Sequence, residues 1–348
     1  MRTFPRPAIV PLILMVAALG ACSSAAGDEP ASAPPTTPAP AAVGYPLTIE
    51  HALGVTTLTE QPVRVATVNW ANHEVPLSLG VVPVGMAAAN FADEDGDGLL
   101  PWVKDKLDQL GAATPVLFDE SDGIDFEAVA DTQPDVILAA YSGLTQEDYD
   151  TLSKIAPTVA YPDTPWTTSW RDMIRLNAAG MGMAAEGDVL IADLETQIQA
   201  AAAAHPVLSQ TSVMFLTHVD VTDLSVVTFY TPADTRVQFF SDLGLKTPAS
   251  IAAFEPNPTN PYAGSISAEN ADTFNDVGLI VTYGDQAMID TLKADPLLGL
   301  MPAIASDAVV LLDGSSANAT AANPTPLQLP YLLDWYVGRL AAAAERSR

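Results

Sequence analysis

Residues that could carry out acid–base or metal chemistry are present in this chain, but their spacing does not assemble a known centre. Asp93, Asp95 and Asp97, followed by Gly98, resemble the start of a calcium-binding loop. Such a loop needs a bidentate glutamate at its twelfth position, and that position holds Lys104. The sequence therefore favours a solvated acidic loop over a calcium site.

The histidines and serines likewise indicate neither a metal centre nor a hydrolase. The four histidines, His51, His73, His205 and His218, share no metal-ligand spacing, so no zinc or manganese site is expected. The sequence contains neither a G-x-S-x-G elbow nor a glycine-rich phosphate loop. We therefore expect no catalytic residue, no bound metal and no cofactor.

Aromatic side chains recur at the ends of predicted strands or in the loops beside them. They are Trp70, Phe91, Tyr141, Trp166, Tyr230 and Tyr262. Ligands of open α/β sheets bind beyond the carboxyl ends of the strands, so these side chains could line an aromatic cleft. Each of them could instead pack in the core.

Basic side chains are scarce near these aromatic positions. Arg171 and Arg175 lie four residues apart on one predicted helix, and Arg236 begins the helix that follows Tyr230. A guanidinium suits paired contacts with carboxylate or hydroxamate oxygens, so Arg171 and Arg236 are candidate ligand anchors. The alternative for each is an ordinary ion pair in a very acidic protein.

The element that must position these residues is a long helix predicted over residues 184–204. Val189, Leu190, Leu194 and Ile198 recur at helical spacing, and Pro206 follows its end. Short apolar strands alternate with helices on both sides of it, which predicts two α/β lobes with mainly parallel sheets. We interpret the helix as a strut between the lobes, with an ordinary surface helix as the alternative.

A faint internal repeat supports two related lobes. The stretch 124–127 (IDFE) matches 266–269 (ISAE), and 137–141 (ILAAY) matches 279–283 (LIVTY). Both pairs are offset by 142 residues, and each unit ends in a tyrosine at the carboxyl end of a strand.

The N-terminus reads as an export signal followed by a tether. Arg2 and Arg6 precede a short apolar run, and Leu19-Gly20-Ala21-Cys22 resembles a lipobox whose cysteine is acylated. Cleavage before Cys22 removes both arginines and leaves 12 basic against 42 acidic residues, a net charge of −30. Residues 23–44 are rich in Ala, Pro, Ser and Thr and predict an extended tether. A cleaved signal without lipid is the alternative.

From residue 45 to 344 the chain resembles the substrate-binding lipoproteins of iron–siderophore ABC importers, relatives of the ferric-hydroxamate and cobalamin binding proteins. The stretches that carry the resemblance, in order, are RVATVNW, LSLGVVPVG, PDVILAAYSGLTQEDYDTLSKIAPTV, DTPW, FFSDLGL, ISAENAD and PLLGLMPAIASDAVVLLDG. The resemblance implies a class III periplasmic binding protein fold, with two Rossmann-like lobes joined by one bridging helix. The expected organisation is a signal peptide and lipobox (1–22), a tether (23–44), an N-terminal lobe (45–165), an interlobe segment with the bridging helix (166–206), and a C-terminal lobe with a closing helix (207–348).

The resemblance also assigns roles to individual residues. Five of the six aromatic candidates, all except Phe91, fall near positions that face the ligand in that family. Glu147 and Glu269 match the acidic residues that dock onto arginines of the permease, although an acid near a helix start is also favourable in itself. The hydroxamate binders carry an arginine just after the position of Phe91, where this chain has Ala92, which argues against an anionic ligand.

The expected function is capture of a ferric siderophore between the two lobes and its delivery to an ABC permease. The protein is expected to be exported, lipid-anchored at the outer face of the cytoplasmic membrane, and monomeric. Its strong negative charge makes nucleic acid a poor partner, although a high-salt habitat would also favour such acidity. The alternatives are a haem or corrinoid binding protein of the same architecture, or a secreted enzyme or adhesion module.

Overall fold

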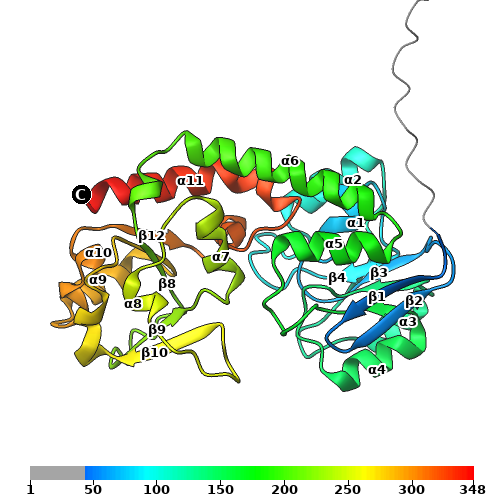
Figure 1. Cartoon of the computed structure of the whole chain (residues 1–348), viewed down its shortest axis with the longest axis horizontal. Helices are drawn as coiled ribbons and strands as arrows, with labels where there is room; N and C mark the ends of the chain where they lie inside the picture. The colour runs from blue at the N-terminus through cyan, green and yellow to red at the C-terminus, as the bar shows by residue number, and fades with distance from the viewer. Residues whose placement is uncertain (1–43) are drawn as a thin grey trace, which may run out of the picture. The chain divides into compact units, whose positions relative to one another are not determined.

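The computed structural model describes residues 44–348, so the predicted signal, Cys22 and nearly all of the tether lie outside it. The described residues contain two five-stranded sheets, and each sheet is the centre of one lobe (Figure 1). No helix within this range is both long enough and apolar enough to cross a membrane.

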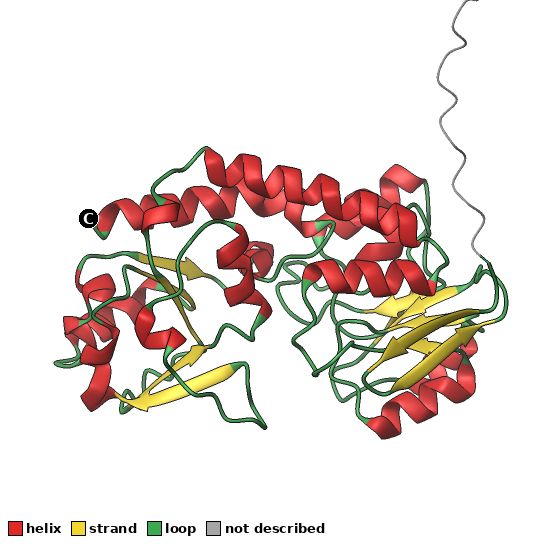
Figure 2. Cartoon of the chain, viewed as in Figure 1, coloured by secondary structure: helices red, strands yellow, loops and turns green. Residues whose placement is uncertain are grey.

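The first lobe is built on a parallel sheet with the strand order β5, β4, β3, β6, β7. The strands are β3 (Val65–Thr67), β4 (Gly85–Ala87), β5 (Val116–Phe118), β6 (Val136–Leu138) and β7 (Thr158–Val159). The helices are α1 (Glu74–Ser78), α2 (Pro101–Leu110), α3 (Phe126–Asp131), α4 (Gln146–Ile155) and α5 (Trp170–Gly180). Helices cover both faces of this sheet (Figure 2), which explains why β6 is apolar at every position.

A hairpin of β1 (Leu47–His51) and β2 (Gly54–Leu58) lies against the first lobe. Its residues are held by polar contacts as well as by packing. The amide of Ala52 donates to the carbonyl of Tyr161 at 2.9 Å, and the hydroxyl of Thr56 donates to the carbonyl of Thr158. The sequence of residues 45–55 with Leu58 predicts a short hairpin, and the structure confirms it.

The second lobe is built on a mixed sheet with the order β10, β9, β8, β11, β12. Its strands are β8 (Val213–Leu216), β9 (Val226–Tyr230), β10 (Ala263–Ser267), β11 (Leu279–Tyr283) and β12 (Val309–Leu312). Its helices are α7 (Thr235–Asp242), α8 (Ala249–Ala252), α9 (Gln286–Ala294) and α10 (Pro302–Ala305), with 3₁₀ turns η1 (Leu208–Gln210), η2 (Ala268–Phe274), η3 (Leu298–Leu300) and η4 (Ala317–Ala322). Strands β8, β11 and β12 run parallel, whereas β9 and β10 are antiparallel to their neighbours.

The two halves of the sequence repeat fall at equivalent places in the two sheets. The segment 137–141 covers the end of β6, and 279–283 is β11; each of these strands is fourth in its sheet, beside β3 or β8. The repeat therefore brings Tyr141 and Tyr283 to corresponding ends of corresponding strands.

The long predicted helix is α6 (Ala184–Ala203), and it packs against α5 of the first lobe and against α11 (Gln328–Arg346), which closes the chain (Figure 1). Its buried residues are Gly187, Ile191, Leu194 and Ile198. Val189 shares the helical spacing of the other apolar residues, but it is 71% exposed and does not belong to the buried face. A Cβ at Gly187 would lie 2.6 Å from the Cβ of Ala178, so glycine permits the close approach of α6 to α5.

A second connection between the lobes lies at the start of α11. The carboxylate of Glu74 in α1 is buried, and it accepts hydrogen bonds from the backbone amides of Leu327 and Gln328 at 2.9 and 3.2 Å. The indole of Trp102 donates to the same carboxylate at 2.7 Å. A carboxylate satisfies the free amides at a helix start and is favoured there by the helix dipole. The first lobe thus caps the helix that ends the chain.

Most predicted elements are confirmed, with their errors at short or irregular strands. The sequence predicts strands over 63–68 and 81–85 and a helix over 268–274. The strand over 63–68 is reduced to β3, and Val63 is 81% exposed. The predicted strand 81–85 is displaced to β4, strands β5 and β10 were not predicted, and the predicted helix 268–274 is a run of 3₁₀ turns.

Candidate ligand-binding site

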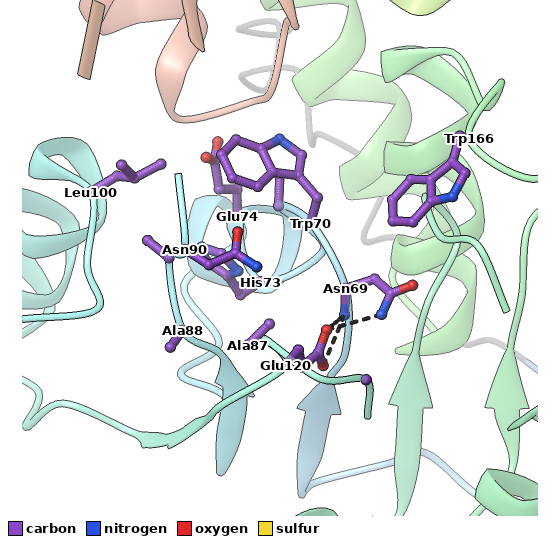
Figure 3. A pocket seen from close by; sticks show the side chains of 13 residues that line it. Asn69, Trp70, His73, Glu74, Ala87, Ala88, Asn90, Leu100, Glu120 and Trp166 are labelled. Atoms are coloured by element: carbon purple, nitrogen blue, oxygen red, sulfur yellow. Dashed lines mark hydrogen bonds between the residues drawn. The ribbon is translucent and has the colours of Figure 1, made fainter. Parts of the chain in front are cut away.

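A hollow of about 440 Å³ opens at the carboxyl edge of the first sheet (Figure 3). Its walls come from the segments that follow β3, β4, β5 and β7, which meet at one edge because these strands are parallel. Its lining includes Asn69, Trp70, His73, Asn90, Glu120 and Trp166. The two tryptophans that the sequence proposed as ligand contacts, Trp70 and Trp166, therefore line the same hollow.

Trp70 and His73 contribute polar atoms that have no partner among the described residues. The indole nitrogen of Trp70 and Nδ1 of His73 are both buried without a hydrogen bond. Burial lowers the pKa of His73 to about 4, so the imidazole is neutral at physiological pH. Both residues line the hollow, but these two nitrogens are enclosed by protein atoms.

A carboxylate also lines this hollow. Both the backbone amide and the side-chain amide of Asn69 donate to Oε2 of Glu120 at 2.9 Å, and Figure 3 shows the two side chains together. Burial raises the pKa of Glu120, and the two hydrogen bonds from Asn69 oppose that rise. Asn69 in turn accepts the amide of Gly143 at 3.1 Å, so it joins the ends of β3, β5 and β6.

The position of Trp166 depends on a glycine. Trp166 has φ +61° and donates its backbone amide to the carbonyl of Ser142 at 3.0 Å. A Cβ on Gly143 would lie 2.2 Å from Nε1 of Trp166, so only glycine leaves room for the indole. The ring of Trp166 meets the ring of Tyr141 nearly at right angles, with centroids 5.5 Å apart.

Tyr141 connects the first lobe to the second. Its backbone is fixed by the buried side chain of Asn72, which donates to its carbonyl at 2.8 Å and accepts its amide at 3.0 Å. Its hydroxyl lies 3.5 Å from that of Thr235 at the start of α7. Tyr141 is itself buried, so it supports Trp166 and contacts the second lobe from behind the hollow's surface.

A second hollow of about 410 Å³ opens at the carboxyl edge of the second sheet. Its lining includes Phe91, His218, Tyr283, Asp285, Met288 and Asp313. Phe91 comes from the first lobe, and its ring lies 6.3 Å from Trp70 and 5.9 Å from Tyr283 between centroids. Phe91 therefore connects the aromatic surfaces of the two hollows.

Arg236 lies behind the second hollow and is strongly held. Its Nε and a terminal nitrogen donate to the two oxygens of Asp234 at 2.8 and 2.6 Å. Its guanidinium stacks 3.7 Å from the centre of the Tyr230 ring. Burial alone would lower the pKa of Arg236, but the hydrogen bonds and charge of Asp234 outweigh it and raise the pKa well above its usual value.

Five of the eight sequence-predicted ligand positions do not line either hollow among the residues that the structure describes: Tyr141, Arg171, Tyr230, Arg236 and Tyr262. Arg171 donates to Glu195 of α6 at 2.6 Å and to Asp242 of α7 at 3.0 Å. Tyr230 lies under Arg236, and Tyr262 precedes β10, where its carbonyl accepts the amide of Thr231. The ligand roles of these residues stay predictions.

The acidic loop is closed by a lysine. The nearest carboxylate oxygens of Asp93, Asp95 and Asp97 all lie within 4.8 Å of one another. The ammonium of Lys104 lies 2.7 Å from Asp95 and 2.8 Å from Asp97. The loop also reaches the second lobe, because Glu94 accepts the backbone amide of Ala317 at 2.8 Å.

Glu147 and Glu269 lie on the surface of different lobes. Each is the second residue of its element, α4 or η2, and each side chain is exposed. Among residues 44–348, neither carboxylate takes part in an ion pair. Figure 1 shows α4 and β10, which leads directly into η2, on the side of their lobes away from α6.

Several lining residues were missed by the sequence analysis. Glu120 follows β5, a strand of three residues that was not predicted. Asn69 has φ +60°, a conformation that asparagine tolerates better than most residues, but no local pattern indicates where its side chain points. Tyr283 carried a usable signal, because the internal repeat placed it in register with Tyr141.

Two α/β lobes with aromatic-lined hollows at their strand ends, joined by a long helix, define a two-lobed ligand-binding protein. The chain belongs to the periplasmic binding protein family, whose profile matches residues 65–315.

Among solved structures, it is similar to PiaA of Streptococcus pneumoniae in complex with ferrichrome, with 42% identity and a TM-score of 0.82 over 87% of this chain and all of that chain. It is 27% identical over 288 residues to the ferric enterobactin-binding periplasmic protein FepB of Escherichia coli, which covers 78% of this chain and 85% of FepB. SirA of Staphylococcus aureus, complexed with staphyloferrin B, shares the fold at 20% identity and a TM-score of 0.64 over 84% of this chain and 98% of SirA.

Proposed function

We propose that this protein is the extracytoplasmic substrate-binding component of an ABC importer and that it captures a ferric siderophore between its lobes. The observation that carries the proposal is the aromatic lining of the two hollows, in which Phe91 contacts both Trp70 and Tyr283 and Trp166 lines the first hollow. The similarity to PiaA, solved with ferrichrome, supports it over the full length of that chain.

The chemistry of a ferric siderophore suits this site. The organic chelator already fills the coordination sphere of the iron, so the protein does not need to supply metal ligands. A bulky chelate instead needs apolar walls with a few polar groups that fix its orientation. Trp70 and Phe91 provide the walls, while Asn69, Asn90 and Glu120 provide the polar groups.

We further propose that the protein acts by binding alone, as a monomer, and that it does not turn its ligand over. The family and the relatives named above are binding proteins, which supports this proposal. Incubation of the protein with its ferric ligand, followed by recovery of the ligand and mass analysis, should return the chelator unchanged.

Acylation of Cys22 would hold the protein at the outer face of the cytoplasmic membrane, with residues 23–44 as the tether. The lipobox and the single cysteine of the sequence support this proposal. Metabolic labelling with a fatty acid tests it directly: the wild type should incorporate label and partition with membranes, whereas Cys22→Ser should do neither. Label in the Cys22→Ser variant would contradict it.

Titration by tryptophan fluorescence tests the ligand class. Trp70 and Trp166 line the first hollow, so a bound ferric chelate should quench their emission. A panel of ferric siderophores is compared with haem and a corrinoid. Trp335→Phe serves as a control because Trp335 lies on α11 beside Arg339 and lines neither hollow. Tight binding of haem with no quenching by any siderophore would overturn the proposal in favour of a haem-binding protein.

A further inference from the structure

Carboxylates without a matching cation surround the two hollows. Glu120 lines the first hollow, and Asp285 and Asp313 line the second. The carboxylate of Glu74, which also borders the first hollow, is buried against the start of α11, and burial raises its pKa. Neither lining includes a lysine or an arginine among the residues that the structure describes. A binding site with one sign of charge and low-dielectric walls raises the local potential of that sign.

The basic groups closest in the fold to this surface are already neutralised or uncharged. Arg236 is paired through two hydrogen bonds with Asp234, whose side chain is only 3% exposed. Arg171 is held by Glu195 and Asp242. His73, the histidine of the first hollow, is neutral because burial lowers its pKa to about 4. None of these groups is available to balance an anionic ligand without losing its own partner.

We propose that the site selects ferric chelates that carry no net negative charge, and that Glu120 is the residue that determines this selectivity. The inference rests on the proposed function, because it concerns the same hollows. Neutral or cationic hydroxamate chelates satisfy it, whereas a trianionic tris-catecholate chelate does not.

Glu120 has the geometry for this role. Asn69 holds its carboxylate at the wall of the first hollow through two donors on Oε2. A carboxylate has about four acceptor positions, so the remaining lone pairs can accept N–H groups of a peptide or ammonium portion of the chelate. The same carboxylate repels a chelate whose own oxygens carry negative charge.

The experiment compares three ferric chelates by fluorescence titration: ferrioxamine B (charge of about +1), ferrichrome (neutral) and ferric enterobactin (about −3). We expect the neutral or cationic chelate to bind at least about 100-fold more tightly than the trianion at low salt, with the difference shrinking as salt screens the repulsion. N-acetylated and N-succinylated ferrioxamine B keep the same iron-chelating scaffold and change its net charge from about +1 to about 0 and about −1. They therefore vary charge with the chelate core held constant.

Glu120→Gln is the decisive variant, and Asp119→Asn is its matched control. Asp119 is the exposed neighbour of Glu120 and does not line either hollow. Glu120→Gln should raise the ratio of the affinity for the trianion to the affinity for ferrichrome roughly tenfold. Asp119→Asn should leave this ratio unchanged.

The experiment distinguishes failure of the charge-selectivity inference from failure of the proposed function. If the wild type binds ferric enterobactin as tightly as ferrichrome, or if both variants shift its affinity equally, the inference is wrong and the proposed function stands. If no ferric chelate binds while haem does, the proposed function itself fails.

Discussion

Phe91 of the first lobe packs its ring edge against Tyr283 of the second, with centroids 5.9 Å apart and planes at 87°. Edge-to-face contacts of this kind are favourable beyond the area that they bury. Both residues also line the second hollow. One aromatic contact therefore holds the lobes together and forms part of the surface offered to a ligand.

Truncation of Phe91 tests how much its ring contributes to ligand affinity. Phe91→Ala should weaken binding of the ferric chelate by about 10- to 100-fold, because buried aromatic anchors dominate binding energy. Tyr331→Ala is the matched control, since Tyr331 packs on Trp102, is half-exposed and lines neither hollow. Titration calorimetry on both variants checks the prediction, which fails if the two lose affinity equally.

Gly143→Ala should disturb the site without removing any ligand-contacting side chain. The new Cβ would lie 2.2 Å from Nε1 of Trp166, so the indole must move. We expect about tenfold weaker binding with a nearly unchanged melting temperature, because Trp166 is 38% exposed and can swing outward.

Gly338→Ala serves as the control for that substitution. Gly338 lies within α11, and no atom lies within 4 Å of the position that a Cβ would take there. Alanine is favoured over glycine inside helices by roughly 0.5–1 kcal/mol, so this variant should gain slightly in stability and keep its affinity. Equal affinity losses in the Gly143 and Gly338 variants would contradict the role assigned to Gly143.

Glu147 and Glu269 should act in transport and not in binding. Both carboxylates are exposed, they lie on different lobes, and neither residue lines either hollow. Glu147→Ala combined with Glu269→Ala should abolish uptake of the iron chelate by cells and leave the affinity of the purified protein unchanged. Glu127→Ala, a change in another first-turn acid of the first lobe, provides the control. Loss of ligand affinity in the double variant would rule out a docking role.

His73 should make the unliganded protein sensitive to acid. Its pKa is lowered from 6.5 to about 4 by burial, so the folded state takes up this proton less readily than the unfolded chain. The stability linked to His73 is complete above pH 6.5 and is lost as the pH falls through 6.5 towards about 4. The loss amounts to about 3 kcal/mol at most, at 1.36 kcal/mol for each unit of pKa difference.

Denaturant unfolding of wild type and His73→Gln between pH 4 and 8 measures this effect. Burial also lowers the pKa of His51, so the two proteins must be compared at each pH and not judged from one curve. The wild type should lose more stability than the variant on acidification. Parallel curves would show that His73 does not couple folding to protonation.

The fold could be predicted from the sequence where its elements are long and periodic. The helix α6, the hairpin and strands such as β8 and β11 carry clear patterns, and the repeat anticipated that β6 and β11 are equivalent. Strand β5 could not be predicted because it has three residues, of which Val116 is half-exposed. Strand β10 contains glycine and serine, and its pairing with β9 supplies the order that its composition lacks.

The candidate site was only partly predictable, because side-chain partners from distant segments decide it. The sequence indicated Arg171 as a candidate anchor. It did not indicate Asp242, 71 residues away, which accepts a hydrogen bond from Arg171. For Arg236 the ion pair that the sequence left as an alternative is present, and its partner is Asp234, two residues earlier. Asn69 and Glu120 lie 51 residues apart, and nothing local to either indicates that they meet.

The cap that Glu74 places on α11 affects the heat-capacity change expected when the ligand binds. Because the cap, α6 and the Phe91–Tyr283 contact already join the lobes, ligand entry buries little protein surface beyond the walls of the hollows themselves. The heat-capacity change of binding follows the apolar area that is buried. It should therefore be small and negative here, and it should scale with the apolar surface of the chelate and not with the size of the lobes.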